Sequence, residues 1–428
     1  MYVLYSLLLA CAAILSLPWW LVQTLRLGKY RVGLSERLGF VPARLRNAKP
    51  GSIWVHAVSV GEVLAVSRLI TELKDAYPAT QILVSTTTAT GQRLARERFG
   101  ETQCFLMPLD LGFAVRAYLN ALKPRLLLLA ETELWPNLLH LARKQGTAVA
   151  IVNARISDRS FPRYRRFGWF FRPVLANVDL FLTQTAGDAE RLRQIGAASE
   201  RIQVSGNLKF DIRPHPSSRL AEALRAAIAG GSPIMVFGST AEGEEEIVLE
   251  AFQQVRKKVP AAVMVLAPRH PERFDKVANL IVARGIPLVR RSAWSSTGTL
   301  NSGVFLLDSV GELASVYGIA DVAFVGGSLV PVGGHNILEP AQFGAALVVG
   351  PHTFNFREII SIFEKGDAIR IANAHDLAGS LLGLLGDTED RRRVGQRGKA
   401  LFEQYAGATQ RTLQALRPLL APGKARGQ

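Results

Sequence analysis

The chain has 428 residues, which is long for one domain and predicts two. Its formal net charge of +16 predicts an anionic partner, namely a membrane surface, a phosphorylated substrate or nucleic acid. The two cysteines, Cys11 and Cys104, exclude a disulfide framework and fit a reducing compartment. The seven histidines form no HExxH motif or paired cluster, so no metal site is predicted.

Residues 1–27 predict a membrane anchor. No charged residue occurs from Met1 to Leu25, and the apolar core from Val3 to Val22 is long enough to cross a bilayer. Trp19 and Trp20 stand near its end, and basic residues follow from Arg26 to Arg46, which predicts a single anchor with the remaining chain on the cytoplasmic side. The alternative is a helix buried in the first domain.

Residues 28–210 alternate strands and helices from Ser52 onward, which predicts a parallel sheet with helices on both faces. Acidic and polar residues stand where predicted strands end, and doubly wound sheets bind ligands there. These residues are Ser59, Glu62, Glu131, Asn153 and Arg155.

Glu62 has two interpretations of equal weight. It follows a buried strand and lies in the first turn of a helix, whose dipole is expected to keep the carboxylate ionised. An ionised carboxylate in a cleft can take a proton from an attacking hydroxyl. An acid at a helix N-terminus can also have no other role.

A densely basic and aromatic stretch covers Arg155 to Arg172. Arginine forks bind phosphates and aromatic rings suit a membrane interface, so Arg163, Arg165 and Arg166 are predicted to form an acceptor and membrane patch. The alternative is a solvated helix face over an apolar inner face. Lipid is favoured over nucleic acid because an anchor is already predicted.

A Pro- and Ser-rich passage, His215 to Ser218, predicts a connection between domains, and Lys209 stands at this junction. The strand–helix alternation then restarts and predicts a second domain over residues 211–428. The GSTAEGEEE segment after one strand is a candidate phosphate cradle, although its glutamates would oppose an anion. Arg269, at the end of the next strand, is predicted to bind a phosphate or a base edge. No Walker A or G-x-G-x-x-G pattern occurs, which disfavours ATPase and dinucleotide functions.

The stretch from Phe324 to Phe356 predicts a βαβ unit with two glycine pairs between its first strand and its helix. Glycine lets backbone N–H groups approach a ligand, and the helix N-terminus favours a phosphate. Glu339, in the first helical turn, can accept two hydrogen bonds from a ribose diol. A nucleotide site is therefore predicted, with a purely structural turn as the alternative.

Two successive Rossmann-like halves with a late glutamate-bearing glycine loop predict an α/β fold of GT-B type. In this fold two Rossmann-like domains face each other across a cleft, and here an N-terminal membrane-anchor helix is added. The first domain is expected to bind the acceptor and the second the donor nucleotide.

With these residues in place, the chain resembles the 3-deoxy-D-manno-octulosonic acid (Kdo) transferases of Gram-negative bacteria. The likeness covers nearly the whole chain and rests on seven blocks in order, which is far more specific than any single block. They are HAVSVGE (56–62), ETELWPN (131–137), NARIS (153–157), GNLKFD (206–211), PRHPERF (268–274), FVGGSLVPVGGHNILEP (324–340) and GPHTFNF (350–356).

The resemblance implies an inverting glycosyltransferase that moves Kdo from CMP-Kdo to the lipid A precursor, lipid IVA, and releases CMP. It implies action at the cytoplasmic leaflet of the inner membrane, with no cofactor, no metal and no nucleic-acid partner. Glu62 is then the general base, and Glu131 and Lys209 support the transition state. The implied CMP contacts are Pro268, Arg269, Val310, Gly311, Glu312, Asn336, Ile337, Leu338 and Glu339.

Two other functions stay open at this point. One is another GT-B nucleotide-sugar transferase or a sugar-nucleotide epimerase, although epimerases lack a lipid acceptor. The other is a membrane-tethered nucleotide-binding module, in which Glu62 would be idle.

Overall fold

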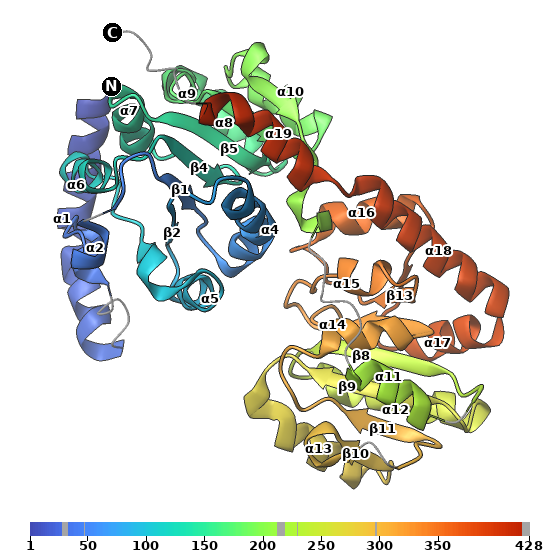
Figure 1. Ribbon diagram of the computed structural model, residues 1–428. Helices are drawn as coiled ribbons and strands as arrows, with labels where there is room; N and C mark the ends of the chain where they lie inside the picture. The colour runs from blue at the N-terminus through green and yellow to red at the C-terminus, as the bar shows by residue number, and fades with distance from the viewer. Residues whose placement is uncertain (28–32, 47, 212–218, 229, 296–297, 422–428) are drawn as a thin grey trace. The chain divides into compact units, whose positions relative to one another are not determined.

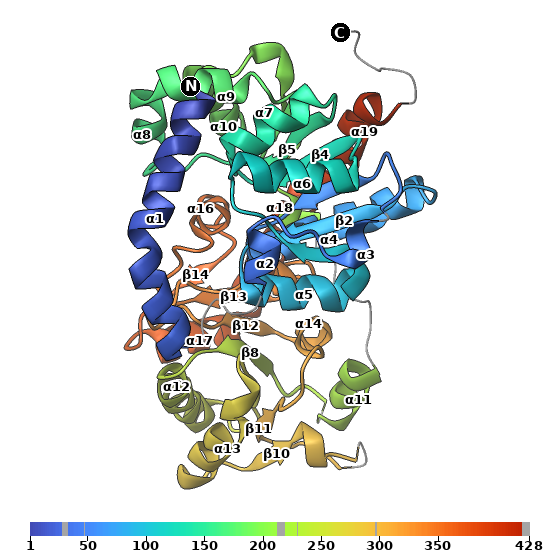
Figure 2. The same ribbon diagram turned by 90° about the vertical axis from the view of Figure 1, so that its left-hand side faces the viewer.

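The computed structural model describes residues 1–27, 33–46, 48–211, 219–228, 230–295 and 298–421 (Figures 1 and 2). The contacts divide the chain into two compact units, and each is an α/β fold around a parallel sheet. The first unit is Met1–Ile212 with Ala406–Gln428, and the second is Arg213–Tyr405. The predicted connection at His215 to Ser218 lies outside the described residues.

The first unit has a seven-stranded sheet in the order β3-β2-β1-β4-β5-β6-β7, and every neighbouring pair is parallel. The strand order reverses between β1 and β4, which makes the carboxyl ends of these two strands a topological switch point. The strands are β1 (Ile53–His56), β2 (Ile82–Thr86), β3 (Cys104–Leu106), β4 (Leu126–Ala130), β5 (Ala148–Ala154), β6 (Leu180–Thr183) and β7 (Ile202–Val204).

Helices cover both faces of this sheet, so its strands are apolar runs rather than alternating ones. Trp54 contributes to the core under α6 (Gly112–Leu122) and α7 (Pro136–Lys144). Ile53 and Val55 contribute to the core under α4 (Val60–Ala76) and α5 (Ala89–Phe99) on the other face. The helical segments are α1 (Tyr2–Leu27), α2 (Leu34–Arg37), α3 (Ala43–Arg46), α4 (Val60–Ala76), α5 (Ala89–Phe99), η1 (Glu101–Gln103), α6 (Gly112–Leu122), α7 (Pro136–Lys144), α8 (Phe161–Arg166), α9 (Gly168–Leu175), α10 (Ala186–Gln194), η2 (Ser199–Arg201), η3 (Leu208–Asp211) and α19 (Ala408–Leu420).

The second unit has its own seven-stranded parallel sheet, in the order β10-β11-β9-β8-β12-β13-β14. Its strand order reverses between β8 and β12, which defines a second switch point. The strands are β8 (Ile234–Thr240), β9 (Val263–Pro268), β10 (Leu288–Arg290), β11 (Gly303–Leu306), β12 (Val322–Val325), β13 (Ala346–Val349) and β14 (Arg370–Ile371).

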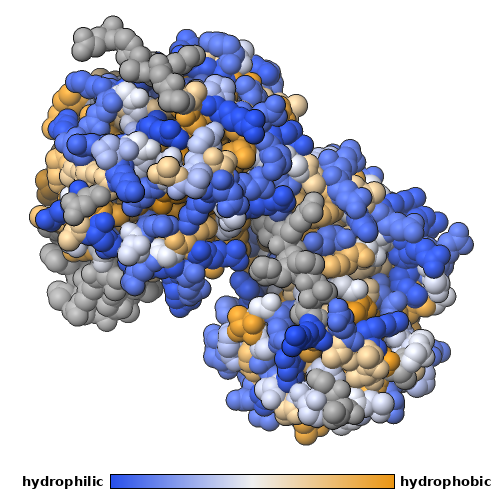
Figure 3. All heavy atoms as spheres, viewed as in Figure 1, coloured by the Kyte–Doolittle hydropathy of each residue, from blue (hydrophilic) through white to orange (hydrophobic). Residues whose placement is uncertain are grey.

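The core of the second unit joins this sheet to α12, α13 and α17. On the face seen in Figure 3, hydrophilic side chains predominate in both units, because most large apolar side chains are buried in the cores. The helical segments are α11 (Arg219–Ala227), α12 (Glu244–Lys258), η4 (Pro271–Arg273), α13 (Phe274–Ala283), η5 (Arg291–Ala293), α14 (Leu313–Val316), η6 (Tyr317–Ile319), α15 (Leu338–Ala341), α16 (Arg357–Lys365), α17 (Leu377–Gly386) and α18 (Thr388–Tyr405).

The predicted second domain, residues 211–428, included the C-terminal helix α19. In the structure α19 belongs to the first unit. Leu413, Leu416 and Leu420 are buried in the first unit's core. The buried carboxylate of Asp211 accepts hydrogen bonds from the N–H groups of Gly407 and Thr409, just before and at the start of this helix. Burial of these leucines holds the returning chain on the first unit.

The predicted membrane anchor is wrong. Helix α1 forms, but among the residues that the structure describes no helix is long and apolar enough to cross a membrane, which removes the basis for a single anchor in the inner membrane. Polar groups of its first two turns contact α7. The Tyr2 ring stacks on His140 with centroids 3.9 Å apart, and the Ser6 hydroxyl donates to Asn137 Oδ1 at 3.2 Å.

Candidate active site

Glu62 lies in the first turn of α4, directly past the carboxyl end of β1 at the first switch point. Its side chain is buried, with 8% exposed. The carboxylate accepts a hydrogen bond from the Val58 N–H at 2.8 Å and another from the Ser59 hydroxyl at 2.9 Å. Two local donors therefore fix the orientation of an acid at the sheet edge where ligands bind.

The pKa of Glu62 is raised to about 7, chiefly because burial disfavours the charged form. The Val58 N–H and the Ser59 hydroxyl lower this pKa, and the charges of Glu131 and Glu133 raise it. The expectation that the helix dipole keeps Glu62 ionised is therefore wrong, because both protonation states are populated at neutral pH. A pKa near 7 suits a group that must accept a proton under these conditions.

Glu131 occupies the other side of the same switch point, directly after β4. Its φ is +55°, a backbone conformation that costs on the order of 1 to 2 kcal/mol for a residue with a side chain. Lys209 Nζ lies 3.5 Å from Glu131 Oε1, so the structure brings these two predicted residues together.

Glu133 is an acid that the sequence analysis did not select. Burial raises its pKa, and the charge of Glu131 raises it further. It also contributes to the raised pKa of Glu62, so three carboxylates share this edge of the sheet. The signal was present as the second acid of the ETELWPN block, but the sequence does not show that this acid lies close enough to Glu62 to raise its pKa.

Asn153 explains why Lys209 reaches Glu131. It is the last but one residue of β5, is fully buried, and its Oδ1 accepts the N–H of Leu208 at 3.0 Å. One residue further, the N–H of Lys209 donates to Asn207 Oδ1 at 3.0 Å. The first bond attaches the short helix η3, which carries Lys209, to the carboxyl edge of the first sheet, and the second fixes the turn at the start of η3.

The arginines Arg163, Arg165 and Arg166 are exposed on α8. Phe161 and Tyr164, on the same helix, pack against the core of the first unit. The helix thus has the charged outer face and apolar inner face of the alternative interpretation, and its outer face remains open to an anion.

The predicted donor residues of the second unit follow strands at its carboxyl edge. Pro268 ends β9, and the N–H of Arg269 donates to Thr240 O at 3.0 Å, next to the end of β8. The charge of Arg269 lowers the pKa of Glu339, although burial raises that pKa overall. Burial, followed by the charge of Arg269, lowers the pKa of His335 to about 4. The structure therefore brings Arg269, His335 and Glu339 within electrostatic reach of one another.

The segment Asn336 to Glu339 offers backbone atoms and polar side chains to the predicted donor site. Ile337 and Leu338 are buried, so only their backbone atoms are available to a ligand. Asn336 Oδ1 accepts the Leu338 N–H at 3.2 Å, and its Nδ2 lies 3.5 Å from Glu339 Oε1. Asn336 thereby fixes the turn just before α15 and contacts Glu339.

The loop after β11 contains the remaining predicted contacts. Val310 is 78% exposed, Gly311 follows it, and the carboxylate of Glu312 binds the guanidinium of Arg291 through two bonds of 3.2 and 3.1 Å. The Ser309 hydroxyl also donates to this carboxylate. An ion pair thus holds Glu312 before any ligand binds.

Backbone N–H groups at the first glycine pair, which were expected to approach a ligand, bond to the protein itself. The N–H groups of Gly327, Ser328 and Leu329 donate to the buried carboxylate of Glu244 at 2.6, 2.8 and 2.7 Å. A protein carboxylate thus takes the bonds that a phosphate was expected to take. The sequence did not indicate this partner, because Glu244 precedes the loop by more than 80 residues.

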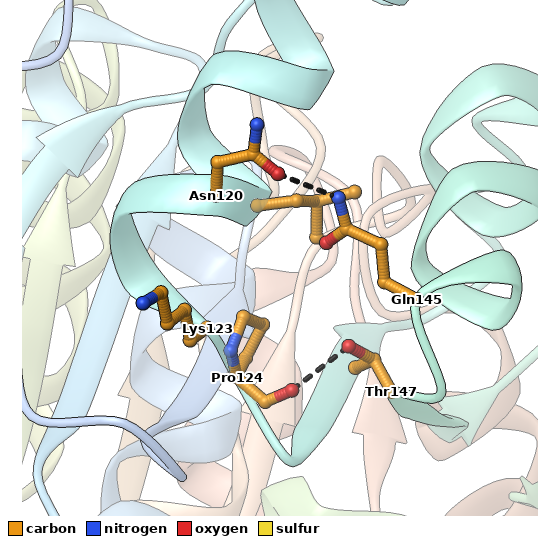
Figure 4. A pocket seen from close by; sticks show the side chains of 6 residues that line it. Asn120, Lys123, Pro124, Gln145 and Thr147 are labelled. Atoms are coloured by element: carbon orange, nitrogen blue, oxygen red, sulfur yellow. Dashed lines mark hydrogen bonds between the residues drawn. The ribbon is translucent and has the colours of Figure 1, made fainter.

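Figure 4 shows a pocket of about 390 Å³ in the first unit that is unrelated to these residues. It lies beside the starts of β4 and β5, at the amino edge of the sheet, and its polar side chains bond locally, Gln145 to Asn120 and Thr147 to the Pro124 carbonyl. Across the described ranges, no three His, Cys, Asp or Glu side chains gather so that they could hold a metal ion.

Comparison with known proteins agrees with this architecture. The UDP-GlcNAc 2-epimerase of Neisseria meningitidis, solved with UDP-GlcNAc, has a similar fold, with a TM-score of 0.57 and 12% identity over 86% of this chain and all of that one. The family model described as 3-deoxy-D-manno-octulosonic-acid transferase (kdotransferase) matches residues 32–212.

Two relatives match along most of the chain. The 3-deoxy-D-manno-octulosonic acid transferase of Haemophilus influenzae is 37% identical, over 92% of this chain and 92% of that protein. The enzyme of the same name from Bordetella pertussis is 37% identical, over 91% and 92%.

The two doubly wound sheets give a fold of GT-B-like type, and the relatives show that the chain is a glycosyltransferase. The match to the relatives is specific enough to say more. The chain belongs to the family of 3-deoxy-D-manno-octulosonic acid (Kdo) transferases, as the seven sequence blocks predicted.

Proposed function

We propose that this protein transfers Kdo from CMP-Kdo to the lipid A precursor, lipid IVA, with release of CMP and inversion at the anomeric carbon. Membership of the Kdo transferase family supports the transfer of Kdo in lipopolysaccharide biosynthesis. The observation that carries the mechanism is the buried Glu62 carboxylate, fixed by two donors at the first switch point, with a pKa of about 7.

Glu62 acts as the general base. It takes the proton from a sugar hydroxyl of the acceptor, and the oxygen attacks the anomeric carbon of Kdo. The bond from that carbon to the phosphate oxygen breaks on the opposite face, and CMP leaves with the electron pair. A positively charged, oxocarbenium-like carbon forms in between, as in other glycosyl transfers. One displacement of this kind inverts the configuration.

Lys209 and Glu131 support the transition state. CMP gains negative charge as it leaves, and an ammonium group held in place beforehand stabilises such charge without reorganisation. The ion pair with Glu131 and the bonds at Asn153 and Asn207 keep Lys209 in one position. Glu133 helps to keep the pKa of Glu62 near neutrality.

The second unit holds the donor. Arg269 binds the phosphate of CMP through a charge-assisted fork, and Glu339 accepts the ribose hydroxyls. Pro268, the loop Val310 to Glu312 and the backbone of residues 336–338 complete the contacts. The proximity of Arg269 and Glu339, which affects the pKa of Glu339, supports this arrangement.

The exposed arginines of α8 bind the phosphates of the acceptor where a membrane surface presents it. Their positive charge also attracts anionic lipid headgroups, each contact being worth about 1 kcal/mol near such a surface. Their exposure on α8, outside the core, supports this role.

A product assay with CMP-Kdo and lipid IVA tests the proposal. We expect a Kdo-modified lipid and one CMP for each Kdo transferred. The Glu62→Ala variant is expected to lose transfer and keep its affinity for CMP. If the wild-type protein transfers a sugar only from a different nucleotide donor, the donor assignment is wrong; if Glu62→Ala turns over near normally, the base is wrong.

A further inference from the structure

Glu244 is a fully buried acid whose carboxylate is surrounded by backbone donors. Besides the three N–H groups of the glycine loop, the N–H of Ala241 donates to it at 2.8 Å. Four backbone donors on one carboxylate satisfy both of its oxygens. Glu244 begins α12, directly after the turn that follows β8.

The pairing of β8 with β12 brings these segments together. The loop leaves β12 at Gly326, where a Cβ would lie 2.6 Å from Ser239 O and 2.7 Å from Thr240 Cα. Only glycine allows this close approach between backbones. The loop therefore passes directly over the first turn of α12, where Glu244 accepts its N–H groups.

A second contact holds the loop from the other side. The Ser328 hydroxyl donates to Val325 O at 2.6 Å and accepts the N–H of Gly350 at 2.8 Å. The N–H of His352 donates to Ser328 O at 2.9 Å. The first turn of the loop is thus fixed between α12 and the segment after β13.

This turn sets the position of the residues that follow. The Gly327 carbonyl accepts the N–H of Gly334 at 2.7 Å, so the two glycine pairs are joined. A Cβ at Gly327 would lie 2.8 Å from His335 Cδ2, which shows how closely the His335 ring packs on the turn. His335 leads directly into Asn336 and Glu339.

We propose that Glu244 is a positioning residue for the donor site. Acting as an internal anion, it replaces a ligand phosphate on the first glycine turn and holds residues 326–339 in the donor-binding conformation before the donor arrives. The proposal rests on the assignment of this loop to the donor in the function above. Because Glu244 occupies the first glycine turn, the donor phosphate binds elsewhere at the carboxyl edge of the second sheet, near Arg269.

The Glu244→Gln variant tests this role. A glutamine amide offers one acceptor oxygen and turns two N–H groups toward the donors of the loop, so the four bonds cannot all form. If the binding-competent loop is then populated a tenth of the time or less, the Kd for CMP rises roughly tenfold or more. We expect this rise by calorimetry, together with a matching rise in KM for CMP-Kdo and an unchanged KM for the acceptor.

Asp321→Asn is the matched control. Asp321 also accepts a backbone N–H, that of Ile234 at 2.9 Å, but it stands at the start of β12, at the opposite edge of the same sheet. This variant is expected to keep wild-type affinity for CMP. Equal losses of affinity in both variants, or wild-type affinity in Glu244→Gln, would overturn the positioning role. Failure of the wild-type protein to bind CMP would instead refute the donor assignment.

Hydrogen exchange on the wild-type protein gives a second test that needs no variant. The amides of Gly327, Ser328 and Leu329 are expected to be protected in the free protein and to change little on addition of CMP. If these amides exchange rapidly in the free protein and slow only when CMP is added, the ligand and not Glu244 binds them. That result would refute the proposal.

Discussion

Replacing Glu62 by glutamine is expected to slow transfer by orders of magnitude and, at the same time, to stabilise the first unit. Burial raises the pKa of Glu62 from its ordinary value of 4.5 to about 7. The folded protein therefore holds the proton more tightly than the unfolded chain, and stability is lost as the pH rises from about 4.5 to about 7. A shift of roughly 2.5 units at 1.36 kcal/mol each corresponds to about 3 kcal/mol above pH 8 and about 1 kcal/mol at pH 5.

Glu62→Gln removes this loss because the amide does not ionise. Its oxygen can still accept the Val58 N–H, and its N–H can donate to the Ser59 hydroxyl, so the local bonds are kept. Transfer should fall by about 10² to 10⁴ without the base. The variant should gain roughly 2 kcal/mol over the wild type between pH 5 and pH 8.5, or about 4 to 8 °C in the transition of the first unit.

Differential scanning calorimetry at the two pH values measures this gain, and the comparison cancels any pH-independent effect of the substitution. Glu97→Gln, at an exposed position on α5, is the control. Its difference in transition temperature from wild type should not grow between pH 5 and pH 8.5. If the difference in transition temperature between Glu62→Gln and wild type stays constant from pH 5 to pH 8.5, the raised pKa of Glu62 is refuted. The proposal that this base has a pKa near neutrality then fails as well.

Three further predictions follow from the same groups. The kcat/KM for transfer should rise about tenfold per pH unit below pH 7 and level off above it, because Glu62 must be ionised; a flat profile from pH 5.5 to 7 would contradict this. Lys209→Met should lower kcat by about 10² to 10³ while the Kd for CMP changes little, so an unchanged kcat would remove its role in the transition state. Replacing the three α8 arginines by glutamine should raise KM for the lipid acceptor more than for CMP-Kdo, and 0.5 M salt should reduce the difference between variant and wild type; equal acceptor KM values would exclude the patch.

Parallel strands made much of the architecture predictable. Their carboxyl ends meet at one edge, so residues after separate strands are predicted to be neighbours without knowledge of the packing. Glu62 after β1 and Glu131 after β4 stand on either side of the first switch point for this reason. Arg269 and Glu339 lie within electrostatic reach of each other at the second sheet by the same rule.

Features that depend on distant packing were not predictable. The protonation of Glu62 follows from its burial and from neighbouring carboxylates, which outweigh the local helix dipole. Glu244 occupies the glycine turn only because β8 and β12 pair. The return of α19 depends on Asp211, whose partners lie 196 and 198 residues away. An apolar composition at the N-terminus could not show that Tyr2 and Ser6 contact α7.

The central claim is that Glu62 takes the acceptor proton during transfer of Kdo from CMP-Kdo. Single-turnover transfer to lipid IVA at pH 8, with wild-type and Glu62→Gln proteins both saturated with donor, isolates that step. We expect a rate at least about 100-fold lower in the variant, with an equal Kd for CMP. Equal single-turnover rates would contradict it.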